Sequence, residues 1–381
     1  MTEADTSLVE QADRAAAAGD VRAARALLER LESPDFGTWM KLAAMRRMTG
    51  DLPRSLEAVH GALALAPLDF VALLSRAMLL EKLGDPEADE AFGRALAQRP
   101  EGAAAPALAG MIAHAEQRYA AAIDARAASL AAAMAPAEHS ASPDEARRMV
   151  RFRDNALRRT RPWHSEPTHF HYPGLVEREF HDRAAFPWLD TLEAATEAMA
   201  EELAAVTAAE RAELVPYVQY QTHEPLAQWR QLNQSRDWTA IHLIRNGHVV
   251  EANARHCPRT MEVLRAIDQP VIGGCSPNAM FSLLAPGISI PPHNGVANTR
   301  LVCHLPLIVP KGCWFRCGAT TRGWTRGEAF VFDDTIEHEA ANPSDQLRVV
   351  FICDVWHPGL STREREAARL LMEAAGAARA F

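Results

Sequence analysis

The last third of the chain alternates short β-rich runs with turn residues, and this alternation limits the possible folds more than any other feature. The runs cover residues 301–309, 313–317, 329–332 and 348–355, and they are rich in Val, Ile, Phe and Cys. Pro-Lys-Gly, Thr-Arg-Gly and Asn-Pro-Ser-Asp segments separate them. Short strands bounded by such turns are typical of antiparallel sandwiches and barrels. We therefore predict a jelly roll in this part of the chain.

Residues 1–136 have a different character, because Ala and Leu dominate and β-branched residues are scarce. Leu52, Leu56, Val59 and Leu63 recur at intervals of three and four residues, which places them on one face of a helix. Glycine can end one helix and aspartate can cap the next. The residues that punctuate this region are Gly19-Asp20, Gly50-Asp51 and Gly84-Asp85, with Pro34, Pro67 and Pro100 at intervals of 33 residues.

A helix-turn-helix unit that repeats at about this length resembles the tetratricopeptide repeat. We therefore predict a TPR-like helical repeat domain over residues 1–136. Two roles for it remain open. One is a groove that docks a partner or a substrate, and the other is a helical appendage that supports the rest of the chain or a homodimer.

The segment 137–160 is predicted to be a linker, because its first part, AEHSASPDE, contains Ser, Pro and acidic residues and little to bury. Residues 161–381 then form the second domain. Within it we predict helices over about 187–206, 257–266 and 361–381, strands over 217–222 and 239–244, and a turn at Asn246-Gly247. The predicted fold class is an α+β multidomain chain, in which an all-α helical repeat precedes a jelly-roll, cupin-like domain.

Composition argues against several classes of protein. The 381 residues are 48% hydrophobic and 23% charged, a balance typical of globular domains. A net charge of -9 argues against a nucleic-acid-binding surface. No run of 18 apolar residues occurs and the first residues are polar, so we expect a cytoplasmic protein with no membrane segment. The six cysteines are expected to be buried thiols, since Cys313 and Cys317 lack the further pair that a structural zinc site needs.

Two histidines beside turns are the first candidates for chemistry. His293 lies in a Pro-Pro-His-Asn-Gly turn, and His338 follows an Asp-Asp turn 45 residues later. A jelly roll brings the ends of non-sequential strands together, so both imidazoles could bind one metal ion. Imidazole suits Fe(II), and the common oxygenase site adds one carboxylate. That acid usually lies two residues after the first histidine, where this chain has Gly295, so two structural histidines remain an alternative.

Polar residues on apolar strands are the second group of candidates. Arg348 begins the run LRVVF, and its planar guanidinium could donate two parallel hydrogen bonds to one carboxylate of a bound acid. An ion pair with a nearby acidic residue is the alternative. His304 lies in the run LVCHLPL, where a core histidine with satisfied hydrogen bonds is the alternative. Ser282 alone is a weak signal.

Three stretches together resemble one family. They are DWTAIHLIRNG, HNGVANTRLVCHLPL and RGWTRGEAFVFDDTIEHEAANPSDQLRVVFICDVWHP, and the resemblance to the aspartyl/asparaginyl β-hydroxylase family covers about residues 160–358. In that family the first metal ligand is followed by Gly rather than an acid, as Gly295 is here. The resemblance implies a double-stranded β-helix that binds Fe(II), 2-oxoglutarate and O2, preceded in some members by tetratricopeptide repeats.

The resemblance also implies roles for particular residues. His293 and His338 would be the catalytic iron ligands. Apart from the resemblance, the position of Asp333 and Asp334 in FVFDDT suggests that they form the turn and support a ligand histidine. The residues implied to hold 2-oxoglutarate are Arg348, which would bind its distal carboxylate, Ser282 and His304, which would hydrogen-bond it, and Trp238, which would line its pocket. The animal members have a further arginine at the position of Val302. On the same strand face, Arg300 could substitute for that charge, or Arg348 and His304 could act without it.

The implied function is a 2-oxoglutarate-dependent dioxygenase that hydroxylates an unactivated C–H bond, on the β-carbon of an Asp- or Asn-type residue or on a small molecule. A peptide, protein or small-molecule substrate could be docked by the helical repeats. Three alternatives remain open. They are a 2-oxoglutarate-dependent halogenase, in which chloride uses the missing carboxylate's place, a non-catalytic interaction protein built of repeats and a cupin-like barrel, and a metal cupin with isomerase or hydrolase activity.

Overall fold

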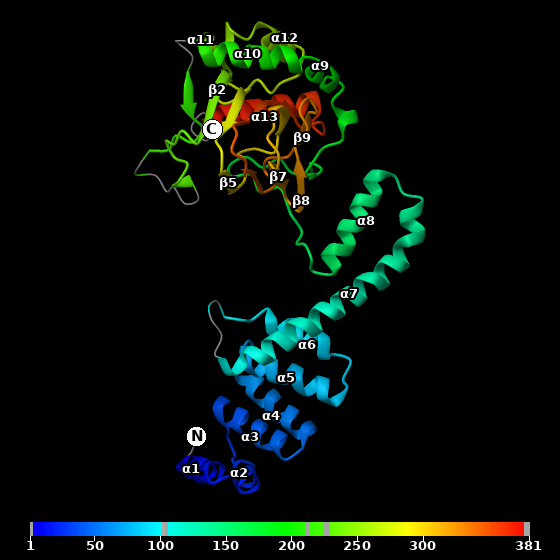
Figure 1. Cartoon of the computed structure of the whole chain (residues 1–381), viewed down its shortest axis with the longest axis vertical. Coiled ribbons are helices and arrows are strands. Elements are labelled where there is room, and N and C mark those ends of the chain that lie inside the picture. Colours follow the sequence, from blue (N-terminus) through cyan, green and yellow to red (C-terminus); the bar gives the residue numbers. More distant parts are fainter. Residues whose placement is uncertain are drawn as a thin grey trace. The chain divides into compact units, whose positions relative to one another are not determined.

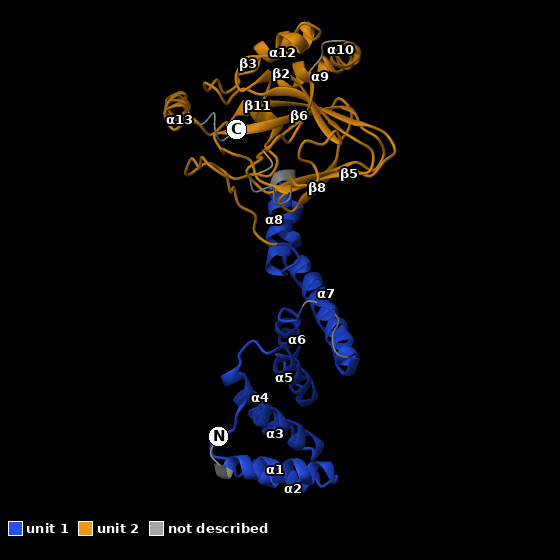
Figure 2. Cartoon of the chain, turned by 90° about the vertical axis from the view of Figure 1, so that its left-hand side faces the viewer, with its two compact units in different colours: residues 1–160 blue, residues 161–381 orange. Residues whose placement is uncertain are grey.

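The computed structural model describes residues 3–100, 102, 106–209, 213–221, 223 and 229–376. The chain divides into two compact units, Met1–Thr160 and Arg161–Phe381 (Figure 2). The segment 137–160, expected to be a linker, is largely helical and lies in the first unit.

The first unit consists of successive helix pairs (Figure 1). The first helices of the three pairs begin at Glu3, Phe36 and Phe70, which reproduces the period of the predicted repeat. No helix in the described part of the chain is both long and apolar enough to cross a membrane. The helices are α1 (Glu3–Ala17), α2 (Val21–Leu28), α3 (Phe36–Met48), α4 (Leu52–Leu65), α5 (Phe70–Leu83), α6 (Ala88–Leu96), the 3₁₀ turn η1 (Pro106–Leu108), α7 (Ala109–His139) and α8 (Pro143–Ala156).

Each Gly-Asp pair separates the two helices of one pair, as predicted. Gly19, Gly50 and Gly84 have φ values of 82°, 83° and 70°, in the left-handed region that glycine adopts without strain. The Asp20 and Asp51 side chains then accept the backbone N–H groups of residues 23 and 54 and cap α2 and α4. Asp85 instead accepts the N–H of Glu87 before α6 begins, so the third junction is two residues longer before its helix.

The second unit contains two antiparallel sheets. The larger has the order β1-β2-β4-β11-β6-β9 with β3 paired to β2, and the smaller has the order β5-β10-β7-β8. The strands are β1 (Leu214–Pro216), β2 (Trp238–Arg245), β3 (His248–Val249), β4 (Ala279–Leu284), β5 (Ile288–His293), β6 (Arg300–Ile308), β7 (Trp314–Cys317), β8 (Thr320–Gly323), β9 (Phe330–Phe332), β10 (His338–Asn342) and β11 (Arg348–Trp356).

The strand order defines a double-stranded β-helix. Of the eight strands from β4 to β11, the larger sheet holds the first, eighth, third and sixth, and the smaller holds the second, seventh, fourth and fifth. The chain therefore crosses repeatedly between two facing sheets, as in a jelly roll. The predicted fold class, a helical repeat followed by a jelly-roll domain, is confirmed.

Alternation along the larger sheet separates two apolar cores. Phe281, Cys303 and Phe351 lie on its outer face, in one cluster with residues of the covering helices. Ala240, Met280 and Val350 lie in a second cluster with side chains of the smaller sheet, between the sheets. The helices of this unit are the 3₁₀ turn η2 (Arg183–Ala185), α9 (Leu189–Ala194), α10 (Thr196–Ala208), α11 (Glu251–Ala254), α12 (Pro258–Arg265) and α13 (Thr362–Ala374).

The strand predicted over 217–222 is wrong for the residues described there. The strand ends at Pro216, and residue 222 lies outside the described residues. The side chain of Asn233 takes the place of a neighbouring strand, because it accepts the N–H of Tyr220 at 2.8 Å and donates to its carbonyl at 3.0 Å. The predicted Asn246-Gly247 turn is present, with φ values of 51° and 80° at these residues, and joins β2 to β3.

Close packing between α3 and α4 generates a prediction for the first unit. A Cβ atom at Gly61 would lie 2.6 Å from Cδ2 of Trp39, so Gly61→Ala forces the indole out of its place. We expect a loss of about 1–3 kcal/mol in the free energy of unfolding. Urea unfolding followed by circular dichroism measures it. Gly110→Ala in α7 is the matched control, because no atom lies within 4 Å of its Cβ, and a loss equal to that of Gly61→Ala would contradict the prediction.

Candidate active site

The pairing of β5 with β10 brings the two predicted histidines together. His293 is the register partner of His338, and their ring centroids are 4.0 Å apart. Within the described residues, no group of three or more His, Cys, Asp or Glu side chains is placed to hold a metal ion. The candidate metal site is therefore a pair of imidazoles.

Backbone carbonyl groups determine which nitrogen of each ring is free. Nδ1 of His293 lies 2.8 Å from the Pro291 carbonyl, and Nδ1 of His338 lies 3.2 Å from the Ile336 carbonyl. A carbonyl oxygen can only accept, so Nδ1 carries the proton in both rings. Nε2 is then the unprotonated nitrogen, which is the form that binds metals. Carbonyl groups two residues before each histidine contact these rings, and the Asp334 backbone also hydrogen-bonds to His338. The Asp333 carboxylate accepts from Thr335 within the turn.

Burial keeps both imidazoles neutral. It lowers the pKa of His293 to about 3, with a further contribution from His338, and it lowers the pKa of His338 to about 4. Neither ring has to lose a proton at neutral pH before its nitrogen can bind a cation.

The place where a carboxylate ligand is usual is closed at Gly295. A Cβ atom there would lie 2.3 Å from Oδ2 of Asp334, closer than any real contact. The Gly295 N–H also donates to the Asp334 carbonyl at 2.6 Å, which ties the two histidine-bearing loops together. The Asp334 carboxylate is held by Arg300 at 3.2 Å, while its Oδ1 is buried without a hydrogen-bond partner. Any side chain at position 295 would displace this ion pair.

Arg300 lies on the strand face that the sequence predicted, but its charge is compensated within the protein. Its guanidinium forms ion pairs with Asp334 at 3.2 Å and Asp354 at 3.1 Å. Burial lowers its pKa, but the two carboxylates outweigh burial and the net pKa is raised. Arg300 therefore has less to offer an incoming anion than an arginine without such partners.

Arg348 is an arginine without acidic partners among the described residues. Its side chain is 2% exposed, its Nη1 donates to the Ser282 carbonyl at a long 3.5 Å, and its Nε has no hydrogen-bond partner. No carboxylate pairs with it among the described residues, and the Trp324 ring lies 5.0 Å from its guanidinium carbon. Burial lowers its pKa to about 10, so it stays charged at neutral pH. A buried cation without a counter-ion is costly unless an anion binds beside it.

Two further donors lie on the same inner face. Ser282 accepts the Trp238 Nε1–H at 3.0 Å, which leaves its own hydroxyl proton to donate. His304 Nδ1 accepts the Trp324 Nε1–H at 3.4 Å, so the proton of the neutral His304 ring is on Nε2. Burial lowers the pKa of His304 well below its usual value.

Aromatic rings connect these donors to the imidazole pair. Trp238 has its ring centroid 6.4 Å from that of His293, and Phe332 lies between His304 at 4.8 Å and His338 at 5.3 Å. The predicted residues His293, His338, Arg348, Ser282, His304 and Trp238 thus surround one interior region. Sequence reasoning missed Trp324 and Trp229, whose ring centroid is 4.8 Å from that of His293. The only sequence signal for Trp324 was its place in the RGWTRGE stretch.

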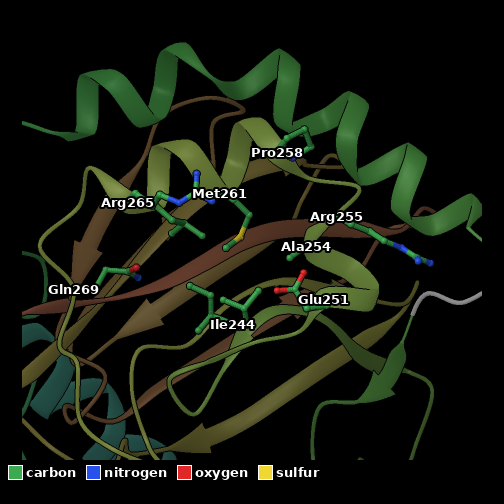
Figure 3. Close-up of a pocket in the computed structure, with 10 residues that line it drawn as sticks. Ile244, Glu251, Ala254, Arg255, Pro258, Met261, Arg265 and Gln269 are labelled. Carbon is green, nitrogen blue, oxygen red and sulfur yellow. The ribbon is translucent and has the colours of Figure 1, made fainter.

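A separate hollow of about 450 Å³ lies away from the imidazole pair, on the outer side of the larger sheet (Figure 3). Ile244, Ala254 and Met261 form its apolar wall, and Arg255 and Arg265 lie at its sides. None of the predicted site residues lines it.

The fold and site define a class of protein, a double-stranded β-helix with a two-histidine candidate metal site between its sheets. Residues 193–358 match the family model described as Aspartyl/Asparaginyl beta-hydroxylase. The resemblance predicted from the motifs is therefore confirmed.

Named relatives match a similar part of the chain. The aspartyl/asparaginyl beta-hydroxylase of Mus musculus is 36% identical over 138 residues, which are 36% of this chain and 18% of that protein. The aspartate beta-hydroxylase domain-containing protein 2 of Homo sapiens is 37% identical over 136 residues, which are 35% of this chain and 37% of that protein. The chain thus spans well under half the length of either relative.

Solved structures resemble each unit only distantly. PcrH from Pseudomonas aeruginosa covers 32% of this chain and 93% of its own length, at 21% identity and a TM-score of 0.27. The Cnp3 cupin domain of Schizosaccharomyces pombe covers 24% of this chain and 62% of its own length, at 12% identity and a TM-score of 0.20. Such scores carry no argument, so the fold assignment rests on the helix and strand order.

The contact between Gly295 and Asp334 generates one prediction. Gly295→Ala pushes the Asp334 carboxylate away from Arg300, and we expect the free energy of unfolding to fall by about 1–3 kcal/mol. Gly295→Asp should lose at least as much, without gaining metal affinity. Urea unfolding and a Mn(II) titration measure both. Gly323→Ala is the control, since its Cβ would lie 3.8 Å from the nearest atom, and tighter Mn(II) binding by Gly295→Asp would contradict the prediction.

Buried neutral histidines generate a prediction about pH. Burial lowers the pKa of six of them, so between about pH 6.5 and about pH 4 the unfolded chain takes up protons that the folded chain does not. We expect the urea midpoint of the metal-free protein to fall as the pH falls from about 7 to about 5. A midpoint that rises would contradict this. The six residues are His181, His242, His293, His304, His338 and His357.

Two carboxyl groups act in the opposite direction. Burial raises the pKa of Asp333 to about 7 and also raises that of Asp334, so protonation of these two groups at lower pH favours the folded state. We expect the six histidines to outweigh them.

Proposed function

We propose that this protein is an oxygenase that depends on Fe(II) and 2-oxoglutarate and hydroxylates a C–H bond. One observation carries the proposal. Arg348 is a buried guanidinium without a carboxylate partner among the described residues, and it lies on the inner face of the same barrel as two neutral, paired imidazoles. A metal ion and an anionic co-substrate would complete both halves of this site. The relatives that match residues 193–358 carry the name beta-hydroxylase, which agrees with it.

The imidazole pair fits Fe(II) as a metal. Both Nε2 atoms are unprotonated, and imidazole nitrogen is a suitable ligand for this ion. Bound iron would supply activation of O2 and oxidation of a C–H bond. The chain itself would orient the ligands, since the Pro291 and Ile336 carbonyls contact the two rings, and Asp334 Oδ1 beside Gly295 is a buried acceptor without a hydrogen-bond partner.

The donors around Arg348 fit a dicarboxylate. Its guanidinium could bind one carboxylate of 2-oxoglutarate through parallel hydrogen bonds. The Ser282 hydroxyl and the Nε2–H of His304 are further donors. Their orientations are already fixed, because Ser282 Oγ accepts from Trp238 and His304 Nδ1 accepts from Trp324. Because these donors are held in place before the anion arrives, little ordering remains to be done on binding. We assign Arg300 to holding Asp334 rather than to the co-substrate.

Aromatic side chains would keep water from this region. The ring centroids of Phe315, Phe330 and Phe332 lie 5.3, 5.3 and 4.8 Å from that of His304. Exclusion of water strengthens the hydrogen bonds and the charge interaction inside and protects reactive species from side reactions.

Hydroxylation fits the site better than halogenation. A chloride ion in the place of the missing carboxylate would lie near the Asp334 carboxylate, which already fills the space beside Gly295. The negative charges of the chloride ion and of the Asp334 carboxylate would repel each other. The non-catalytic alternative leaves the buried charge of Arg348 without a partner.

The substrate is proposed as a class only. A peptide or protein docked by the helical unit, or a small molecule, would be hydroxylated, and an Asp- or Asn-type side chain is the form that the relatives' names favour. Incubation of the enzyme with lysate and 2-oxoglutarate, followed by mass spectrometry, identifies it as a product heavier by one oxygen atom.

Substitution of the central residues tests the proposal. His293→Ala and His338→Ala should each abolish the formation of succinate from 2-oxoglutarate, because one imidazole remains. Arg348→Gln should raise the 2-oxoglutarate concentration needed for half-maximal turnover by about 10-fold or more, as loss of a charged hydrogen-bond partner predicts. Succinate formation at varied 2-oxoglutarate measures all three.

Exposed residues of the same unit are matched controls. His248→Ala in β3 and Arg326→Ala, which removes an exposed ion pair with Glu197, should leave succinate formation unchanged. Full turnover in either ligand variant, or an unchanged 2-oxoglutarate requirement in Arg348→Gln, would overturn the proposed function.

A further inference from the structure

A segment at the start of the second unit crosses both loops that bear the paired histidines. We call residues 165–170 the strap. Its Glu166 N–H donates to the Thr335 carbonyl at 2.8 Å, three residues before His338. Its Thr168 N–H donates to the Gly295 carbonyl at 2.9 Å, two residues after His293. One short segment thus holds the backbone of both loops.

The strap continues along the first loop beyond Gly295. The N–H groups of His169 and Phe170 donate to the Val296 carbonyl at 3.2 and 2.9 Å, and Phe170 forms a parallel bridge with Ala297. At its other end Ser165 forms an antiparallel bridge with Ile336, whose carbonyl orients the His338 ring. The strap is therefore an irregular segment, with an isolated bridge at each end, that joins two loops far apart in sequence.

A buried hydroxyl pair reinforces the second contact. Oγ of Ser165 lies 2.7 Å from Oγ1 of Thr335, and both residues are buried. The Thr335 hydroxyl donates to the Asp333 carboxylate, so it has no proton left for Ser165 and must accept from it. The order of donation is Ser165 to Thr335 to Asp333. The Thr335 carbonyl meanwhile accepts from both Glu166 and Asn294, a neighbour of His293.

We propose that the strap is a positioning element for the metal site, and that Ser165 is its anchoring residue. This inference rests on the proposed function, because it concerns how tightly the imidazole pair binds its metal. Two ligands hold a metal less firmly than three, so more of the affinity depends on how well the ligands are placed before binding. The strap supplies that placement, since neither loop can shift without breaking hydrogen bonds to it.

The strap also lies next to the division between the two units. The first unit ends at Thr160, five residues before Ser165, so the covalent path from the helical repeats to the barrel runs through the strap. A change in the strap would reach the metal site directly.

Mn(II) binding to the full-length chain tests the proposal, with electron paramagnetic resonance as the readout. Ser165→Ala removes only the hydroxyl, and we expect about three- to tenfold weaker Mn(II) binding, as loss of one buried hydrogen bond predicts. Ser55→Ala is the matched control, because it removes a buried serine hydrogen bond, 2.7 Å to the Ala43 carbonyl, in the first unit. It should leave Mn(II) affinity unchanged.

Hydrogen–deuterium exchange on the parent chain provides a second measurement if Ser165→Ala does not fold. Mn(II) should slow exchange in the peptide that covers the strap about as much as in the two histidine loops, and not in helix α8. This inference alone would be overturned if Ser165→Ala bound Mn(II) as tightly as the parent chain. It would also be overturned if Mn(II) left the exchange rate of the strap unchanged. Failure of the parent chain to bind Mn(II) would overturn the proposed function and this inference with it.

Discussion

The antiparallel pairing of β5 with β10 is the interaction on which the site depends. Its register places His293 opposite His338, and a shift of one residue would turn one imidazole to the other face of the sheet. A bulge between His338 and Ala340 marks the point where regular pairing stops and the ligand-bearing loop begins. The paired rings are thus a consequence of sheet geometry rather than of any local motif.

Charge compensation separates two arginines that look alike in sequence. Arg300 and Arg348 both lie on the inner face of the larger sheet and both are buried. Arg300 is held between Asp334 and Asp354, whereas Arg348 has no carboxylate beside it within the described residues. The first arginine stabilises the loops around Gly295, and the second has the binding capacity that an anionic co-substrate needs. A buried charge is informative mainly through its partners.

Much of the architecture could be predicted from local pattern. The Gly-Asp junctions and the apolar spacing of residues 52–63 depend on neighbours within one or two helical turns, so they are readable without a structure. The strand runs ending at residues 309, 317, 332 and 355 correspond to β6, β7, β9 and β11. The strand predicted over 217–222 failed because a distant side chain, Asn233, satisfies the backbone of Tyr220.

The sequence by itself indicated the helical repeat, the jelly-roll pattern, the two candidate histidines and the glycine at a position where an acid is usual. Only the tertiary structure decided which ring nitrogen is free, which arginine keeps an unpaired charge, and which segment holds the ligand loops. The physical reason is sequence distance. Arg300 meets Asp354 across 54 residues and Ser165 meets Thr335 across 170, and contacts of this kind depend on strand register and chain path, which no local pattern encodes.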